Sequence, residues 1–202
     1  MRAPGEQPRS RPVSFRRVAI ALGICALIAV LLYPQRNALR EYRDYFFGGH
    51  KGVSFDLAQL SGDWSEGIVR KRFSEHPVWC GRYEGNLAAD RACGVKIKAY
   101  DDVPAVYLAF FFNASQLRQV AISLPSWAHG KAYDKLVAQY GSPYASQPLP
   151  SAGVRLHGWR LPDGAALFFN RDRPLNPLET NAIYWRSPAE CRSGGCFAGD
   201  RR

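Results

Sequence analysis

Of the five cysteines in this 202-residue sequence, Cys25 is an ordinary apolar residue of the run 18–33, and the other four carry the clearest chemical signal. Cys80 and Cys93 lie thirteen positions apart around a polar, glycine-rich stretch, and Cys191 and Cys196 lie five positions apart in CRSGGC. A redox dithiol usually has the spacing C-x-x-C, which does not occur here. The four histidines are scattered and form no H-x3–5-H pair, which argues against a zinc site. An even number of cysteines with loop-like spacing favours two disulfides, formed in an oxidising compartment.

Four cysteines allow three pairings, and the sequence alone does not choose among them. The local pairs, Cys80–Cys93 and Cys191–Cys196, close short loops and need the least coincidence in the fold. We therefore expect these two disulfides. The first would tie off a loop over residues 80–93 and contribute on the order of 3 kcal/mol by restraining the unfolded chain.

No catalytic constellation is recognisable in the sequence. It has no G-x-S-x-G, G-x-G-x-x-G or G-K-[ST] motif. Asp101-Asp102 could bind a cation or do acid–base chemistry, but two acids between strands are more often a solvated turn. His129, at the start of an expected helix, is more often a capping or surface residue. Four tryptophans could form a ligand-stacking patch, although core packing is their more common role: Trp79, Trp127, Trp159 and Trp185. We expect no enzyme activity, no metal site and no cofactor.

The formal net charge of +10 raises the question of nucleic-acid binding, so the position of the charge matters. Residues 1–17 hold five basic and one acidic residue, whereas residues 52–185 hold 14 basic and 12 acidic residues. The excess therefore sits mainly at the ends of the chain. A nucleic-acid-binding domain concentrates Lys and Arg on its folded surface, so we expect no nucleic-acid partner.

Residues 18–33, VAIALGICALIAVLLY, contain no charged or strongly polar side chain. As a helix they would span about 24 Å, slightly less than a hydrocarbon core of ~30 Å. Arg16, Arg17, Tyr33 and Arg36 flank the segment and are expected at the membrane interface, where arginine side chains can snorkel. A cleaved signal peptide also has a basic start and a short apolar run, but no small-residue cleavage site follows Tyr33. We therefore expect an uncleaved transmembrane helix in contact with the lipid bilayer.

The orientation of this span is nearly undecided by charge, because five Lys/Arg precede it and four follow it. The expected disulfides decide it, since they require an oxidising compartment. We expect a single-pass protein of the inner (cytoplasmic) membrane, with its N-terminus in the cytoplasm and its C-terminal domain in the periplasm.

The rest of the chain divides by composition. Residues 1–17 form a basic cytoplasmic tail without apolar periodicity, and residues 34–52 form a juxtamembrane stalk and linker. The aromatic side chains of the stalk either rest in the membrane interface or pack on the domain. Residues 53–188 form the exported domain, and residues 189–202 form a C-terminal tail with a disulfide loop.

Hydrophobic periodicity predicts an α+β domain. Helices are expected near 64–73 and over 131–141, where Gly141 is the C-cap and Pro143 prevents continuation. Strands are expected over 95–100, 105–112, 117–124, 154–161, 165–170 and 181–187. We expect a two-layer domain in which helices pack on an antiparallel sheet. Whether the two halves, 63–124 and 128–187, are a duplicated α-β-β-β unit is left open.

The helix ending L-x-x-x-Y-G-x-P over 136–143, followed by W-x-L-x-D-G over 159–164, resembles a group of small exported bacterial α+β modules. The pattern is similar to that of the outer-membrane assembly lipoproteins and of the β-lactamase-inhibitor protein. The resemblance covers residues 60–187 in pattern only and implies binding or scaffolding without catalysis.

Two functions from different classes remain. In the first, the protein is a membrane-tethered periplasmic interaction or scaffolding module that docks on a protein of the cell envelope. In the second, it is a periplasmic ligand-binding or hydrolytic domain that acts on cell-wall or lipid material. A deep cleft with convergent polar groups would favour the second, and an exposed apolar patch or an open strand edge would favour the first.

Overall fold

The computed structural model describes residues 18, 20, 22–23, 33–85, 87–148 and 155–197. It shows a mixed α+β fold with one large antiparallel sheet. Residues 40–202 form one compact unit, and residues 1–39 form another. Most of the predicted span 18–33 lies outside the described residues. Within the described residues, none of the helices combines the length and the apolar character that crossing a bilayer requires.

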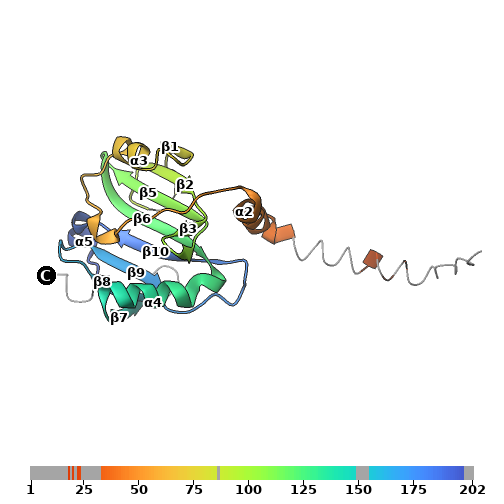
Figure 1. Cartoon of the computed structure of the whole chain (residues 1–202). Coiled ribbons are helices and arrows are strands. Elements are labelled where there is room, and N and C mark those ends of the chain that lie inside the picture. Colours follow the sequence, from red (N-terminus) through yellow and green to blue (C-terminus); the bar gives the residue numbers. More distant parts are fainter. Residues whose placement is uncertain are drawn as a thin grey trace, which may run out of the picture. The chain divides into compact units, whose positions relative to one another are not determined.

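The sheet has eight strands in the order β1-β2-β5-β6-β10-β9-β8-β7 (Figure 1). The first half of the chain supplies α3 (Glu66–Arg72), β1 (Val78–Arg82), β2 (Arg91–Lys96), β5 (Tyr107–Asn113) and β6 (Gln116–Pro125). The second half supplies α4 (His129–Tyr140), β7 (Tyr144–Pro148), β8 (Arg155–Arg160), β9 (Ala166–Asn170) and β10 (Thr180–Arg186). The remaining elements are η1 (Tyr33–Gln35), α2 (Arg36–Phe47), η2 (Leu57–Gln59), β3 (Ala99–Tyr100), β4 (Val103–Pro104), η3 (Ser126–Ala128) and α5 (Pro188–Gly194).

Each half therefore contains one helix followed by four strands of the main sheet, and not the three strands that the sequence pattern suggested. The last strands of the two halves, β6 and β10, pair antiparallel at the centre. Strands β1 and β7 are the two edges. Both were missed because β1 carries the cysteine of an expected loop and β7 is short and polar.

Local sequence explains why the elements begin and end where they do. Ser65 caps α3 by accepting a hydrogen bond from the Ile68 amide, and Gly141 ends α4 with φ 79°. The turn between β5 and β6 places Ala114 and Ser115 at φ 50° and 65°, a left-handed pair that matches the twist of a tight hairpin. Gly164, with φ 87°, makes the turn between β8 and β9.

The main core lies on one face of the sheet, between the strands and the helices α3 and α4. Its largest fully buried side chains come from both halves of the sheet and from the segment before α3: Trp185, Tyr100, Phe110, Phe112, Phe169, Leu57 and Ile97. A second, smaller cluster lies on the opposite face, where Phe168 of β9 packs with Cys196 and Phe197. Together the two clusters bury side chains on both faces of β8 and β9.

Both predicted disulfides are confirmed by pairs at bonding distance, but their surroundings differ from the expectation. Cys80 and Cys93 face each other across β1 and β2 with their Cα atoms 4.0 Å apart. They therefore cross-link a hairpin whose loop covers only residues 83–90. The C-terminal tail is also not simply a loop, because α5 begins at Pro188 and the Cys191–Cys196 bond closes its end.

The end of the predicted stalk packs on the domain. Tyr42 and Tyr45 of α2 are buried, and the Tyr45 carbonyl accepts a hydrogen bond from Lys98 Nζ at 2.8 Å. The Lys51 carbonyl accepts from the Lys98 amide. Of the two alternatives for the stalk aromatics, packing on the domain therefore holds for the two tyrosines.

The unequal loop lengths of the two disulfides predict unequal contributions to stability. We expect the double variant Cys80→Ala/Cys93→Ala to lose about 3 kcal/mol of unfolding free energy, and Cys191→Ala/Cys196→Ala to lose about 2 kcal/mol. Urea unfolding of the two purified variants beside the parent measures both losses. A larger loss from the Cys191–Cys196 variant would contradict this ranking.

Candidate functional site

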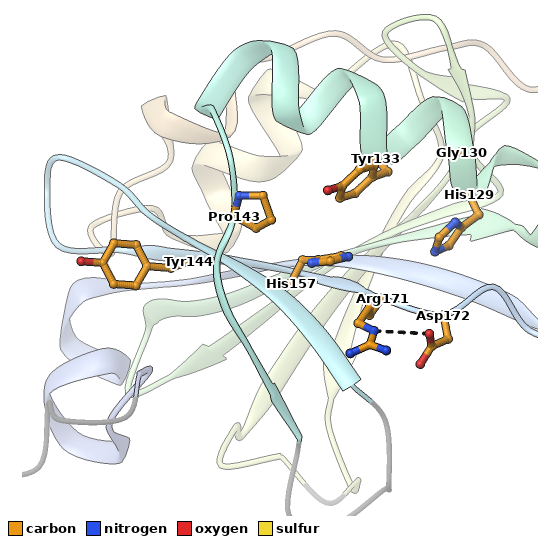
Figure 2. A pocket seen from close by; sticks show the side chains of 8 residues that line it. All are labelled: His129, Gly130, Tyr133, Pro143, Tyr144, His157, Arg171 and Asp172. Atoms are coloured by element: carbon orange, nitrogen blue, oxygen red, sulfur yellow. Dashed lines mark ion pairs between the residues drawn. The ribbon is translucent and has the colours of Figure 1, made fainter.

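A groove of about 570 Å³ lies between α4 and strands β7 to β9. Its lining includes His129, Tyr133, Tyr144, His157 and Arg171. In Figure 2, His129 and Tyr133 come from the helix, His157 comes from β8, and Arg171 follows β9. The groove thus combines aromatic rings with a few polar groups, as small-molecule sites commonly do.

The polar groups of this groove are held by specific contacts. His129 Nε2 lies 2.9 Å from the Asn170 carbonyl oxygen, so this nitrogen carries the proton and donates. The His157 ring lies 4.9 Å from the Tyr133 ring, centroid to centroid. Arg171 Nε lies 3.5 Å from an oxygen of Asp172, which neutralises part of its charge.

Burial lowers the pKa of His157 below its ordinary value, and the positive charge of Arg171 lowers it further. The imidazole is therefore neutral at pH 7 and can donate and accept one hydrogen bond each. The described lining residues include no serine, threonine or cysteine that either histidine could activate as a nucleophile. The arrangement is suited to holding a planar or partly apolar ligand rather than to acyl transfer.

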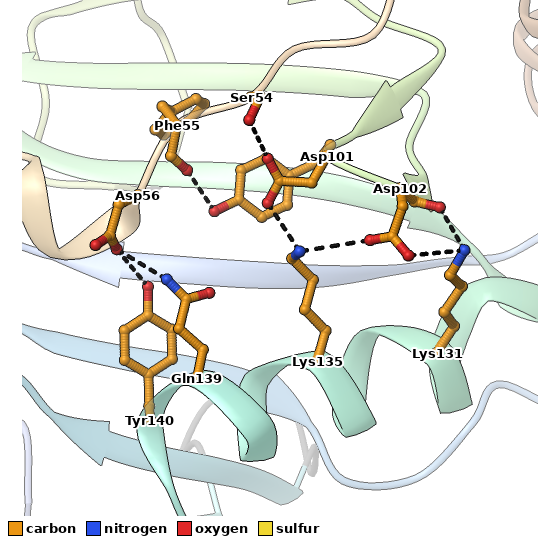
Figure 3. A network of polar contacts seen from close by, with 10 residues as sticks. Ser54, Phe55, Asp56, Asp101, Asp102, Lys131, Lys135, Gln139 and Tyr140 are labelled. Atoms are coloured by element: carbon orange, nitrogen blue, oxygen red, sulfur yellow. Dashed lines mark hydrogen bonds and ion pairs between the residues drawn. The ribbon is translucent and has the colours of Figure 1, made fainter.

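Asp101 and Asp102, the acidic pair named from the sequence, face α4 and are ion-paired. Lys135 Nζ lies 3.0 Å from Asp101 Oδ2, and Lys131 Nζ lies 3.0 Å from Asp102 Oδ2 (Figure 3). Hydrogen bonding to Lys131 lowers the pKa of Asp102. Two lysines pair with these carboxylates, so the acidic pair fastens the β3–β4 turn to α4.

A third acid, Asp56, fastens the segment before α3 to the end of the same helix. Asp56 Oδ1 accepts hydrogen bonds from Tyr140 Oη at 2.8 Å and from Gln139 Nε2 at 3.0 Å, and also from the Ala58 amide (Figure 3). Burial, followed by the Asp56 carboxylate, raises the pKa of Tyr140, so this hydroxyl stays protonated and donates. These contacts position one wall of the groove.

One group of possible metal ligands occurs among the described residues: Glu66, Cys80 and Cys93. The two sulfurs are bonded to each other, so neither is a thiolate, the form that binds metals. Glu66 is engaged by the guanidinium of Arg91, which lowers the pKa of its carboxyl group. These residues do not form a metal site while the disulfide is intact.

The four tryptophans named from the sequence do not form one patch. Trp159 and Trp185 are buried in the core, whereas Trp79 is 55% exposed and Trp127 is 45% exposed. Trp79 lies on the edge strand β1, where its ring contacts Tyr107 at 6.1 Å. Trp127 lies in η3 and contacts a different set of rings on α2.

We call the rings around Trp127 the α2 patch: Tyr42, Tyr45, Phe46, Phe47 and Trp127. The Phe46 and Trp127 rings are stacked at 6.1 Å with 18° between their planes. Tyr42 lies inside the cluster, with its ring 5.3 Å from that of Trp127. Phe46 and Phe47 are exposed.

The residues expected at the membrane interface are described only in part. Arg16 and Arg17 lie outside the described residues. Tyr33 is exposed in η1, and Arg36 begins α2 and donates a hydrogen bond to Tyr33 Oη at 2.8 Å.

Sequence reasoning named His129 but not the other groove residues. Tyr133 is one helical turn after His129, so a helical projection would have found this pair. His157 and Arg171 join them only because β8 and β9 pack beneath α4, which is a tertiary fact. The exposed side of α2 could have been noticed from Phe46-Phe47 at the helix end.

Comparison with known proteins gives no relative: no protein-family model, no curated protein and no solved structure matches this chain.

The lowered pKa of His157 predicts a pH dependence of stability. The unfolded histidine binds a proton near pH 6.5 and the folded one only at lower pH. The folded state should therefore lose stability as the pH falls below about 6.5, until the folded histidine also protonates.

Urea unfolding between pH 7.5 and 5 measures this loss, and a ring-proton NMR titration reports the pKa itself. His157→Gln should flatten the dependence, and Arg171→Gln should raise the pKa of His157. A pKa above 6.5 in the parent protein would contradict the assignment.

Proposed function

We propose that this protein is a single-pass inner-membrane protein whose periplasmic α+β domain docks a protein partner of the cell envelope. The observation that carries the proposal is Trp79, a large aromatic side chain that is 55% exposed on an edge strand. Exposed tryptophans are frequent energetic anchors of protein interfaces, and edge strands accept extended partner segments.

Trp79 has a counterpart in the other half of the sheet: Tyr144 of the opposite edge strand lies beside Gly158 and is 63% exposed. A Cβ atom at Gly158 of β8 would collide with Phe197, so a buried phenylalanine covers that glycine. A Cβ at Gly94 of β2 would collide with Trp79 and Tyr107. The first half thus covers its glycine with a side chain that still presents much of its surface to a partner.

Basic residues surround this edge. The last turn of α3 carries Arg70, Lys71 and Arg72, all exposed, and Arg70 donates to the Val78 carbonyl at 3.4 Å. Exposed Arg82 ends β1. Complementary charge directs association and selects partners, so we infer that the docking segment is extended and acidic.

The repeated order of one helix and four strands also supports a two-layer architecture built from a duplicated unit. The two glycines, Gly94 and Gly158, occupy matching second strands and are each covered by an aromatic ring. In this interpretation one copy has kept its face for a partner while the other was covered by α5 and Phe197.

The groove beside α4 favours a second candidate, a ligand-binding function toward cell-wall or lipid material. Its aromatic lining and the neutral His157 would suit a sugar or another ring-bearing ligand. Mass spectrometry of the natively purified protein distinguishes the candidates, because a small molecule bound without a protein partner would favour the groove.

Membrane placement rests on the uncharged segment 18–33 and on two disulfides, which form in oxidising compartments. A reporter enzyme that is active only in the periplasm, fused after Arg202, should be active. A reporter that is active only in the cytoplasm should be silent at the same position. The reverse pattern would overturn the proposed orientation.

Docking through Trp79 predicts position-specific crosslinking. A photoreactive phenylalanine analogue placed at Trp79 should capture a protein in native membranes. Ile68 of α3 provides a matched control, since it is 42% exposed but lies on the helix rather than on the edge strand. The control should capture little, and Arg82→Glu should weaken capture at position 79. Equal capture at both positions, or none at position 79, would refute docking at this edge.

A further inference from the structure

The α2 patch is a second exposed aromatic surface, separate from the proposed docking site at Trp79 on the edge strand β1. Phe47 is 84% exposed, Phe46 57% and Trp127 45%, although the two phenylalanines end a helix whose inner tyrosines are buried. Scattered exposed apolar residues need no explanation, but three neighbouring large aromatic side chains on one surface do.

Contacts with the domain hold this surface in place. The Pro177 carbonyl accepts hydrogen bonds from Tyr42 Oη at 3.3 Å and from Ser126 Oγ at 3.0 Å, which joins α2, η3 and the loop after β9. Lys98 Nζ lies 4.1 Å from the centre of the Tyr45 ring and 5.3 Å from that of Phe46. On this support Phe46 and Trp127 are presented together as a stacked pair.

The loop fastened at Pro177 adds a further apolar group. Leu175 is fully exposed two residues before that proline. A leucine without packing contributes nothing to the folded core, so its exposure adds to the apolar character of this end of the domain.

The outward side of α2 is cationic. Arg40 and Arg43 are exposed and make no ion pair with any described residue. The acids on the same stretch are Glu41 and Asp44. Asp44 is bound by Lys96 Nζ at 2.5 Å and by His50 Nε2 at 3.2 Å, which leaves Glu41 as the acid that opposes Arg40 and Arg43 on this helix. The exposed charge beside the aromatics is therefore mainly positive.

We propose that the α2 patch, with Arg40 and Arg43, rests on the headgroup region of the membrane. Tryptophan and other aromatic residues are enriched at that depth, and arginine binds anionic headgroups. This inference rests on the membrane tether of the proposed function.

The position of the patch in the chain favours lipid over a protein occupant. The predicted span ends at Tyr33, and α2 begins three residues later at Arg36. The 12 residues of α2 rise about 18 Å in total. The connection therefore keeps Phe46 and Phe47 within about 20 Å of the end of the span, and they reach the headgroups when α2 lies along the membrane surface. Contact with lipid would hold the domain against the membrane and fix which way the β1 edge faces.

Tryptophan fluorescence tests the proposal, because the span 18–33 contains no tryptophan and all five tryptophans follow residue 63. The full chain is reconstituted in nanodiscs of phosphatidylethanolamine and phosphatidylglycerol, with and without brominated acyl chains. Bromine quenches only indoles close to lipid. Trp127→Phe and Trp79→Phe form a matched pair, since both remove an exposed tryptophan.

We expect brominated lipid to quench the parent and Trp79→Phe alike, and Trp127→Phe to lose most of the quenching. Phe47→Ser, at a position that is 84% exposed, should reduce quenching without unfolding the domain. If the chain inserts but quenching is unchanged by Trp127→Phe, the patch does not contact lipid, although the tether stands. If quenching disappears with Trp79→Phe instead, Trp79 on the β1 edge and not the α2 patch lies at the lipid, and the proposal fails. If the chain does not co-purify with nanodiscs, both the tether and the patch are rejected.

Discussion

The antiparallel pairing of β6 with β10 is the interaction on which the rest of the domain depends. Seven residue pairs, from Thr180 opposite Pro125 to Arg186 opposite Gln119, join the two halves into one sheet. Their inward side chains, including Ile122 and Trp185, are fully buried in the shared core. Each half alone is about the size at which burial of apolar surface only just supports folding. Pairing at the centre gives both halves one core and leaves only β1 and β7 as edges.

This pairing also determines what lies on the outer face of the sheet. One continuous row of residues crosses all eight strands: Trp79, Gly94, Ala109, Ala121, Tyr184, Phe168, Gly158 and Tyr144. Aromatic residues stand at both edges, and each has a glycine beside it. Since a glycine in a strand leaves space above it, a neighbouring ring can lie flat on the sheet. In the second half Phe197 fills that space, and in the first half Trp79 does.

Much of this fold was predictable because local sequence determines it. The two helices, the hairpin between β5 and β6 and the local disulfides follow from capping, turn chemistry and spacing, all of which act within a few residues. The edge strands were not predictable in the same way. β1 contains a glycine and a cysteine within five residues and shows no alternation, so only its pairing with β2 makes it a strand. The groove could not be predicted from the sequence for a similar reason, because His157 and Tyr133 meet only after α4 has packed on β8.

Helix α4 shows how the two sides of the domain are coupled. One side of the helix is held by Asp56 and by the acid pair Asp101 and Asp102, while His129 and Tyr133 line the groove. The lysine contacts are exposed and contribute little individually, whereas the Asp56–Tyr140 hydrogen bond is partly buried and has the larger effect on position. A ligand in the groove would therefore contact a helix whose other side is held by these acids.

Since η3 with Trp127 leads directly into α4, the same helix connects the groove to the α2 patch. A rigid α4 would keep the groove and the aromatic patch in a constant relation to each other whichever of them is occupied.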